Sequence, residues 1–356
     1  MERRAFLAFM MSVACVGIVN AAELKSDYKK GQGQQTDGRI VRPPRPPIPA
    51  HNPVADLAAR CQVLNGHHYR GLTVFPVQVA GYELGIAPLT LDEALRQNAI
   101  VITEKGEGQV PVLLVQNRAA EYVFIMAGEI LVGGKQNRIL REDILLPPHS
   151  APIELPAYCV EQGRWMKKAE VFKTDGNLAS AKLRVRAQKA ADQSEVWGGV
   201  AETARELKQE SATGDFNYVY NQRDVANKLG EYREEFCRVL PRQIVGVVVA
   251  RNGEFVGADL FGNSSLFYKH REKVLDSYAI DVLSCVRHIP VPPDRTAAEQ
   301  FLRRVLAAPY HTEGTPGAGT IGRCVGNGID AKGLIFSDRV VHVSLFPAVT
   351  IMPMPR

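Results

Sequence analysis

The sequence has little that points to a membrane-embedded or nucleic-acid-binding protein. After residue 19 of the 356-residue chain, no apolar run approaches the roughly 20 residues that a membrane-spanning helix needs. Positive and negative charges nearly balance, with 43 Lys and Arg against 38 Asp and Glu, and both are dispersed along the chain. A net charge of +5 spread in this way argues against a nucleic-acid partner. With 46% hydrophobic residues, the chain has enough apolar side chains for a substantial globular core.

Cysteine pairs with metal-ligand or redox spacing are also missing. None of the 6 cysteines forms a CxxC pair, so neither a zinc site nor a thioredoxin-like motif is supported. The adjacent His67 and His68 would point to opposite faces of a strand, and the clustered histidines of a cupin-like metal site are absent around His149. We therefore expect no bound metal and no cofactor. Each cysteine is best interpreted as a buried small hydrophobe or a structural disulfide partner.

The longest apolar run lies at the N-terminus. Two arginines precede the apolar stretch 5–19, which is followed by the small residues Ala21 and Ala22. A basic segment, an apolar segment of this length and a small-residue exit are typical of a cleavable secretory signal peptide. We expect residues 1–21 to be removed and the mature chain to be periplasmic or secreted, without stable insertion in a membrane.

The segment after the signal peptide is polar and then proline-rich. Residues 22–55 contain too few apolar side chains to offset the entropy lost on ordering, so we expect a disordered linker. Residues 56–356 are expected to form a single α+β domain. A helical insertion is expected at about 177–240, where Ala, Lys, Gln and Arg dominate.

Short apolar segments separated by Gly, Asn and charged residues predict strands at 72–79, 100–104, 110–116 and 122–126. Thr90 and Glu93 have the spacing of a capping box, which predicts a helix start. Further along, Asn252-Gly253 between apolar runs predicts a hairpin, residues 314–328 a glycine-rich loop, and 334–346 a final strand pair. The predicted fold class is α+β, with a mostly antiparallel, sandwich-like β core, a helical insertion and C-terminal helices.

The most distinctive motifs are GEILVGGKQNR at 128–138 and CVEQGRW at 159–165. The glycine pair permits a turn with positive φ and exposed backbone N–H groups, and cationic and amide side chains follow it directly. An arginine and a tryptophan in the second motif add a bidentate donor and a stacking face. These features predict a site for an anionic small-molecule ligand, formed by Gly133, Gly134, Lys135, Gln136, Asn137, Arg138, Arg164 and Trp165. The alternative is a glycine hairpin whose polar residues are solvated or pair with Glu129 and Glu161.

Catalytic candidates are fewer. Glu129 and Glu161 are the carboxylates within the two motifs, and either is a candidate general acid or base. Cys159 is a weaker candidate nucleophile, because no histidine lies nearby in sequence to activate its thiol. A structural role is the better interpretation of Cys159.

Together with LTVFPV, LTLDEAL, SEVW, GVVVARNGEFVGADLF and VVHVSLFP, these motifs resemble a bacterial family. The family is named for its association with ARG (ADP-ribosylglycohydrolase) and rhodanese-phosphatase-superfamily genes. The resemblance covers residue 56 to the C-terminus and implies no established activity. The family name suggests a link to ADP-ribose or NAD-derived metabolites only through gene neighbourhood, which is not a mechanism.

Three functions remain open at this stage. The first is an exported domain that binds a polar or anionic small ligand through the two motifs. The second is a hydrolase of a nucleotide or ADP-ribose-like compound that uses Glu129 or Glu161. The third is a cell-envelope interaction module whose proline-rich arm docks an unknown protein partner.

Overall fold

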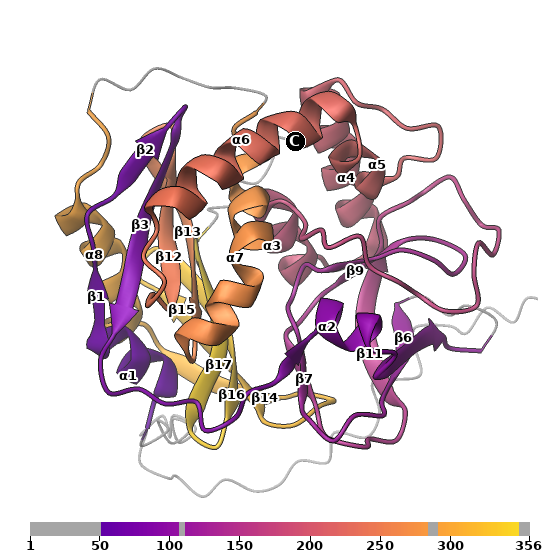
Figure 1. Cartoon of the computed structure of the whole chain (residues 1–356), viewed down its shortest axis with the longest axis horizontal. Coiled ribbons are helices and arrows are strands. Elements are labelled where there is room, and N and C mark those ends of the chain that lie inside the picture. The colour runs from indigo at the N-terminus through magenta and orange to yellow at the C-terminus, as the bar shows by residue number, and fades with distance from the viewer. Residues whose placement is uncertain (1–50, 107–110, 284–290, 349–356) are drawn as a thin grey trace, which may run out of the picture. The chain divides into compact units, whose positions relative to one another are not determined.

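A large antiparallel sheet dominates one side of the structure (Figure 1). The computed structural model describes residues 51–106, 111–283 and 291–348. Within these ranges the sheet has nine strands, in the order β1-β3-β12-β13-β17-β16-β15-β14, with β2 also paired to β3. The strands are β1 (Cys61–Val63), β2 (His67–Tyr69), β3 (Leu72–Val79), β12 (Gly246–Arg251), β13 (Glu254–Phe261), β14 (Tyr310–Gly314), β15 (Thr320–Gly326), β16 (Ile329–Phe336) and β17 (Arg339–Pro347). Segments from both ends of the domain therefore meet in one sheet.

Helices cover both faces of this sheet. Val248 of β12 packs in one core cluster with residues of α1 and α8, whereas its neighbours Val247 and Val249 pack in another with α6 and α7. Successive strand residues point to opposite faces, so β12 is buried because both of its faces are covered. The helices are α1 (Pro53–Arg60), α2 (Leu91–Arg96), α3 (Ala181–Lys189), α4 (Gln193–Leu207), α5 (Phe216–Tyr220), α6 (Arg223–Val239), α7 (Ser264–Ala279), α8 (Arg295–Arg303) and the 3₁₀ helix η1 (Arg304–Ala307).

Two smaller sheets form the other side of the structure (Figure 1). Their orders are β10-β7-β4 and β5-β6-β11-β9-β8, and only the β4–β7 pair is parallel. The strands are β4 (Leu89–Thr90), β5 (Ile100–Glu104), β6 (Val112–Asn117), β7 (Val123–Ile125), β8 (Ile130–Leu131), β9 (Arg138–Leu140), β10 (Ile144–Leu146) and β11 (Ile153–Cys159). Helix α7 packs against both β12 of the large sheet and β4, so it joins the two sides.

A buried polar network also ties the two sides together. Arg184 of α3 donates two hydrogen bonds, of 2.9 and 2.6 Å, to the carboxylate of Asp259 on β13. His342 on β17 bonds Asp259 through Nε2 at 3.1 Å and Asp143 through Nδ1 at 2.7 Å. Burial lowers the pKa of His342, but the two carboxylates outweigh it and raise this pKa to about 9. The imidazole is therefore protonated at neutral pH and bridges β17 to the segment before β10.

The predicted α+β class with a mostly antiparallel core is confirmed. The capping box is also confirmed: the Thr90 hydroxyl accepts from the Glu93 N–H at 3.2 Å, and the Glu93 carboxylate accepts from the Thr90 N–H at 2.9 Å. Asn252 and Gly253 have φ of 48° and 92° in the predicted hairpin between β12 and β13. The expected linker ends earlier than residue 55, because α1 begins at Pro53.

The prediction of a glycine-rich loop over 314–328 is only partly right, because residues 315–319 form the connection between β14 and β15 but residues 320–326 form β15 itself. Much of this segment is paired in the β14–β15 hairpin, and β15 continues into the ladder with β16. A larger residue does not fit at Gly322, because a Cβ there would lie within 3.0 Å of Ile335 and Tyr310. The glycine thus permits close packing within a strand and does not mark a loop.

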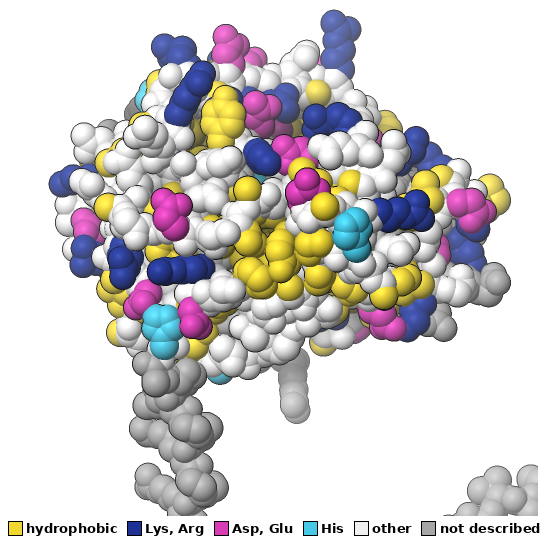
Figure 2. Space-filling model, turned by 60° about the horizontal axis from the view of Figure 1, so that its bottom comes forward, with side chains coloured by type: hydrophobic (Ala, Val, Ile, Leu, Met, Phe, Trp, Pro, Cys, Tyr) yellow, Lys and Arg dark blue, Asp and Glu magenta, His cyan; other side chains and the backbone are white. Residues whose placement is uncertain are grey.

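The surface and the termini add three facts. Figure 2 shows apolar side chains gathered at the centre of the face that lies at the bottom of Figure 1, with charged side chains scattered around them. None of the helices in the described ranges is long and apolar enough to cross a membrane. The predicted signal peptide, nearly all of the predicted linker and Cys285 lie outside the described residues.

Candidate functional site

The glycine pair of the first motif forms a tight turn between β8 and β9. Gly133 has φ of 146° and Gly134 has φ of 49°, so the predicted positive-φ turn is present. A Cβ on Gly134 would lie within 3.0 Å of Glu104 and Phe172, and one on Gly133 within 3.0 Å of the Val171 carbonyl. The turn therefore requires glycine both for its backbone angles and for the packing of its neighbours.

The two motifs meet at this turn through Arg164. Its Nε and Nη2 donate to the two carboxylate oxygens of Glu161, at 2.8 and 2.6 Å. The same guanidinium donates to the carbonyls of Gly134, at 2.8 Å, and Gly133, at 3.2 Å. Burial raises the pKa of Glu161, but bonds from Arg164 and from the Asn137 N–H outweigh burial and lower it. Arg164 and Glu161 thus hold the turn in place. Glu161 accepts four hydrogen bonds and is ionised at neutral pH, so it has no proton to donate as a general acid.

The three residues after Lys135 point inward and are bonded within the protein. Arg138 is 1% exposed, and its guanidinium lies 3.2 Å from the Glu104 carboxylate. The other bonds are Arg138 to the Cys159 sulfur at 2.6 Å, Gln136 to the Gln162 carbonyl at 3.1 Å, Asn137 to the Asp215 carboxylate at 3.0 Å, and the Gly133 N–H to the Asn137 side chain at 3.1 Å. These donors and acceptors are therefore used in hydrogen bonds within the protein, where they stabilise the fold.

Lys135 and Trp165 lie on the surface of the same turn. The Lys135 ammonium is 5.3 Å from the centroid of the Trp165 ring, and Trp165 is 53% exposed. The structure therefore brings all eight predicted ligand residues together. Trp165 of this set is exposed and Lys135 is half-buried, and whether they bind a ligand stays a prediction.

Glu129 is part of a separate buried group. Its carboxylate accepts from the Lys273 ammonium of α7 at 2.7 Å, and Lys273 also lies 2.5 Å from the Asp92 carboxylate on α2. Complete burial raises the pKa of Glu129 to about 7, although Lys273 acts in the opposite direction. Glu129 itself is 0% exposed, so among these three residues Asp92 connects the group to solvent.

Cys159 is also buried, with a free thiol. Burial raises its pKa to about 11, despite the neighbouring Arg138. A thiol in this state is a poor nucleophile, in keeping with its structural interpretation. The other described cysteines, Cys61, Cys237 and Cys324, are free as well.

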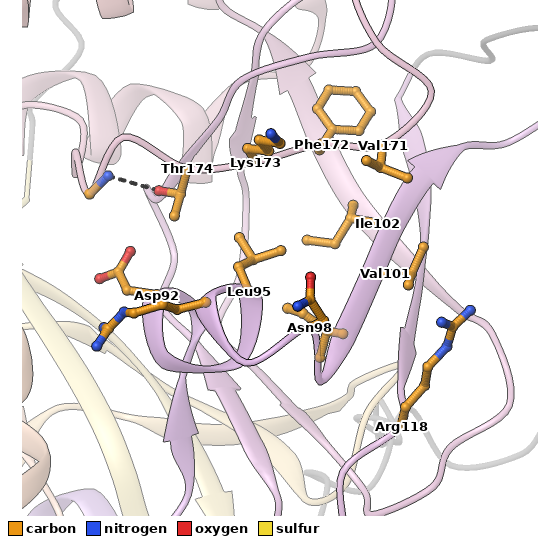
Figure 3. A pocket seen from close by; sticks show the side chains of 13 residues that line it. Asp92, Leu95, Asn98, Val101, Ile102, Arg118, Val171, Phe172, Lys173 and Thr174 are labelled. Carbon is orange, nitrogen blue, oxygen red and sulfur yellow. Dashed lines mark hydrogen bonds between the residues drawn. The ribbon is translucent and has the colours of Figure 1, made fainter.

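An open cleft of about 730 Å³ lies between α2, the edge strand β5 and segment 171–176 (Figure 3). Its floor is mainly apolar and its rim carries charged and amide groups. The lining residues are Asp92, Leu95, Arg96, Asn98, Ile100, Val101, Ile102, Arg118, Val171, Phe172, Lys173, Thr174 and Gly176. Asp92 and Arg118 lie at opposite ends of the cleft, with Leu95 and Asn98 between them (Figure 3).

The charges of this cleft are arranged differently from those of the glycine turn. Arg96, Arg118 and Lys173 are exposed, and none of them forms an ion pair with another described residue. Asp92 is the single carboxylate among the described lining residues, and its charge is already offset by Lys273. With three cations against one carboxylate, the described lining of the cleft carries a net charge of +2.

The glycine turn supports one wall of the cleft from behind. Val132 exchanges two backbone hydrogen bonds with Lys173, of 2.8 and 2.9 Å, and Gly133 packs on Val171. Phe172 donates its N–H to the Ile102 carbonyl at 2.9 Å, which fastens the same wall to β5. The sequence prediction missed the cleft because its lining comes from three separated parts of the chain, namely 92–102, Arg118 and 171–176. The signals that were present are the capped helix start at Thr90 and the lysine at 173.

These features define an α+β domain with a large antiparallel sheet, two smaller sheets, and a cation-bearing cleft backed by a glycine turn. The chain belongs to the family of ARG and Rhodanese-Phosphatase-superfamily-associated Protein domains (ARPP-1), whose model matches residues 60–346. The resemblance inferred from the motifs is thus confirmed. No curated protein and no solved structure matches the chain.

Proposed function

We propose that this domain binds a small anionic ligand in the cleft between α2, β5 and segment 171–176. The observation that carries the proposal is the set of three cations, Arg96, Arg118 and Lys173, which line a cleft of about 730 Å³ without partners among the described residues. A cleft of this volume accommodates a ligand of nucleotide size. Unpaired cations at a protein surface commonly mark recognition of phosphate or carboxylate.

Each part of the cleft has a role in this proposal. Arg118 binds the anionic group, because its planar guanidinium matches two oxygens of phosphate or carboxylate. Leu95 and Ile102 provide the apolar surface for the carbon frame of the ligand. Asp92, at the opposite end from Arg118, and Asn98, between them, offer hydrogen-bonding groups to hydroxyls (Figure 3). The ligand class is thus a polar molecule with an acidic group at one end.

Binding is tested on the full chain by thermal shift and calorimetry with ADP-ribose, NAD, AMP and inorganic phosphate. We expect an anionic compound to raise the melting temperature, and Arg118→Ala and Lys173→Ala each to weaken its binding by about tenfold, the value of one charge-assisted hydrogen bond. Arg223→Ala and Lys228→Ala remove exposed cations of α6 and serve as matched controls. If none of the four compounds binds, or if the cleft and control variants behave alike, the proposal is wrong.

A second candidate function is hydrolysis of the bound compound, and the Asp92–Lys273–Glu129 group favours it. In this case the Asp92 carboxylate takes a proton from the attacking water as the new bond forms, and the Asp92 carboxyl returns this proton to the leaving oxygen as its bond breaks. Lys273 and Glu129 lie behind Asp92 and hold its carboxylate toward the cleft. Turnover of a bound compound that Asp92→Asn abolishes while affinity is retained would establish this function. Binding without turnover in the unmodified chain would exclude it for that compound.

We also propose that the domain works outside the cytosol, behind the signal peptide predicted at residues 1–21. The support is the basic segment, apolar segment and small-residue exit of the sequence. N-terminal sequencing of the chain recovered from the periplasm or medium should begin near Glu23. Recovery of a chain that begins at Met1, in the cytosol, would contradict export.

A further inference from the structure

The loop that carries the second motif exposes two large apolar side chains. In this segment, residues 162–168 and here named the Trp165 loop, Trp165 is 53% exposed and Met166 is 77% exposed. Neither contributes to the cleft described above. Two adjacent large apolar residues in solvent on one loop are unusual, because scattered single residues are the rule on soluble surfaces.

The Trp165 loop is fastened at its base by several hydrogen bonds. Arg164 donates to Glu161, to the glycine turn and to the Met166 carbonyl, the last at 2.9 Å. The Lys168 N–H donates to the Gly134 carbonyl at 2.8 Å. The Gly163 N–H donates to the Thr213 carbonyl at 2.7 Å. The loop therefore holds Trp165 and Met166 outward in a preformed conformation, so a binding event pays little to order it.

Lysines accompany these two apolar side chains. Lys167 and Lys168 follow Met166 directly and are exposed, and the Lys135 ammonium lies 5.3 Å from the Trp165 ring. Lys167 is paired with Glu170 at 2.5 Å and Arg164 with Glu161, so residues 161–170, with three cations against these two carboxylates, keep a net charge of +1 through Lys168. Tryptophan and lysine are the residue types that place an apolar body at the lipid boundary and a charge at the head groups.

We propose that the Trp165 loop docks the domain on the surface of a membrane that contains anionic lipids. Trp165 and Met166 enter the boundary between head groups and acyl chains, while Lys167 and Lys168 contact the anionic head groups. The charge of the loop complements such a surface. A typical stable protein interface involves roughly 20 to 30 residues on each side, far more than the two apolar side chains of this loop. Two apolar side chains assisted by cations suffice for reversible attachment to a membrane.

The test uses the full chain and sedimentation with vesicles of equal parts phosphatidylglycerol and phosphatidylcholine, compared with phosphatidylcholine alone. The chain has two tryptophans, so Trp197→Phe leaves Trp165 as the single indole fluorophore. We expect binding to the anionic vesicles that weakens with salt, together with a blue shift of Trp165 emission. Trp165→Ala with Met166→Ala should weaken binding by about tenfold or more, and Lys167→Ala with Lys168→Ala by about tenfold.

The matched control removes exposed apolar side chains elsewhere, by Val291→Ala with Leu306→Ala, and should leave vesicle binding unchanged. The proposal is overturned if the anionic vesicles do not sediment the chain, if Trp165 emission does not shift, or if the loop and control variants bind alike. It is also overturned if the loop variants abolish self-association in solution while vesicle binding persists, because the loop is then an interface between copies. Neither Trp165 and Met166 nor Lys167 and Lys168 line the cleft, so these substitutions should not change the binding of small anions there. A failure of the membrane proposal is thereby distinguished from a failure of the cleft proposal.

Discussion

The glycine turn and the neighbouring cleft both contain clustered polar and cationic residues, but they use them in opposite ways. At the turn, Arg138 and Arg164 are bonded to carboxylates and carbonyls of the protein itself. In the cleft, Arg118 and Lys173 have no such partners among the described residues. A cation can bind a ligand strongly only if its donors are not already used by the fold. A distinctive motif in sequence is therefore evidence of a structural constraint first and of a binding site second.

The largest expected difference between the two regions is in stability. Glu161→Ala leaves the Arg164 guanidinium without its carboxylate and the Asn137 N–H without its acceptor, so the free energy of unfolding should fall by roughly 3 kcal/mol or more. Arg118→Ala removes an exposed cation that forms no ion pair with another described residue, and it should change this free energy by less than about 0.5 kcal/mol. Urea unfolding followed by circular dichroism measures both. Equal effects of the two substitutions would remove the distinction between turn and cleft.

A second difference concerns pH, because the two motif carboxylates have opposite pKa shifts. The pKa of Glu129 rises on folding from 4.5 to about 7, so the folded state binds more protons than the unfolded state between these values. Stability supplied by protonation of Glu129 is present below pH 4.5 and is lost as the pH rises toward 7, by on the order of 2–3 kcal/mol. The pKa of Glu161 is lowered, so its contribution is present above pH 4.5 and is lost as the pH falls.

Unfolding free energies measured from about pH 3 to about pH 7.5 test this prediction. Glu129→Gln should flatten the part of the profile that declines between pH 4.5 and 7, because glutamine does not titrate. Glu161→Gln should leave that part in place and change only the acidic end. If Glu129→Gln retains the full slope, another buried carboxyl such as Asp276, whose pKa is also raised to about 7 by burial, is responsible.

The parts of the fold that the sequence predicted well are those set by local chemistry. The ranges 72–79 and 100–104 match β3 and β5, and Thr90 caps α2 as its spacing predicted. The glycines of 314–328 misled because glycine serves a turn and a tightly packed strand equally well, and only Ile335 and Tyr310, distant in sequence, decide between them.

Contacts between residues that are distant in sequence also limited the prediction of the site. The motifs correctly placed Arg164 beside the glycine turn, but pairing of its donors with Glu161 and two carbonyls depends on how the two segments fold together. The cleft has no contiguous signature at all. Asp92 and Lys173 are separated by most of the first half of the domain, and they lie at one site because segment 171–176 runs beside β5.

The smallest expected effect tests whether the turn and the cleft are coupled. Gly134→Ala places a methyl group within 3.0 Å of Glu104 and Phe172 at φ of 49°, so it should cost about 1–3 kcal/mol in stability. Gly81→Ala is the matched control: its φ of 63° imposes comparable backbone strain, but a Cβ there meets no atom within 4 Å. The difference between the two substitutions isolates the packing of the turn against the cleft wall.

Coupling also has a consequence for binding. Phe172 must move to admit the methyl group of Gly134→Ala, and it is a lining residue of the cleft. Affinity for an anion that binds the cleft should therefore change in Gly134→Ala and stay constant in Gly81→Ala, as measured by calorimetry under conditions where both variants are folded. Equal affinities in the two variants would mean that the turn stabilises the fold without shaping the cleft, and the two regions would then be independent despite their contact.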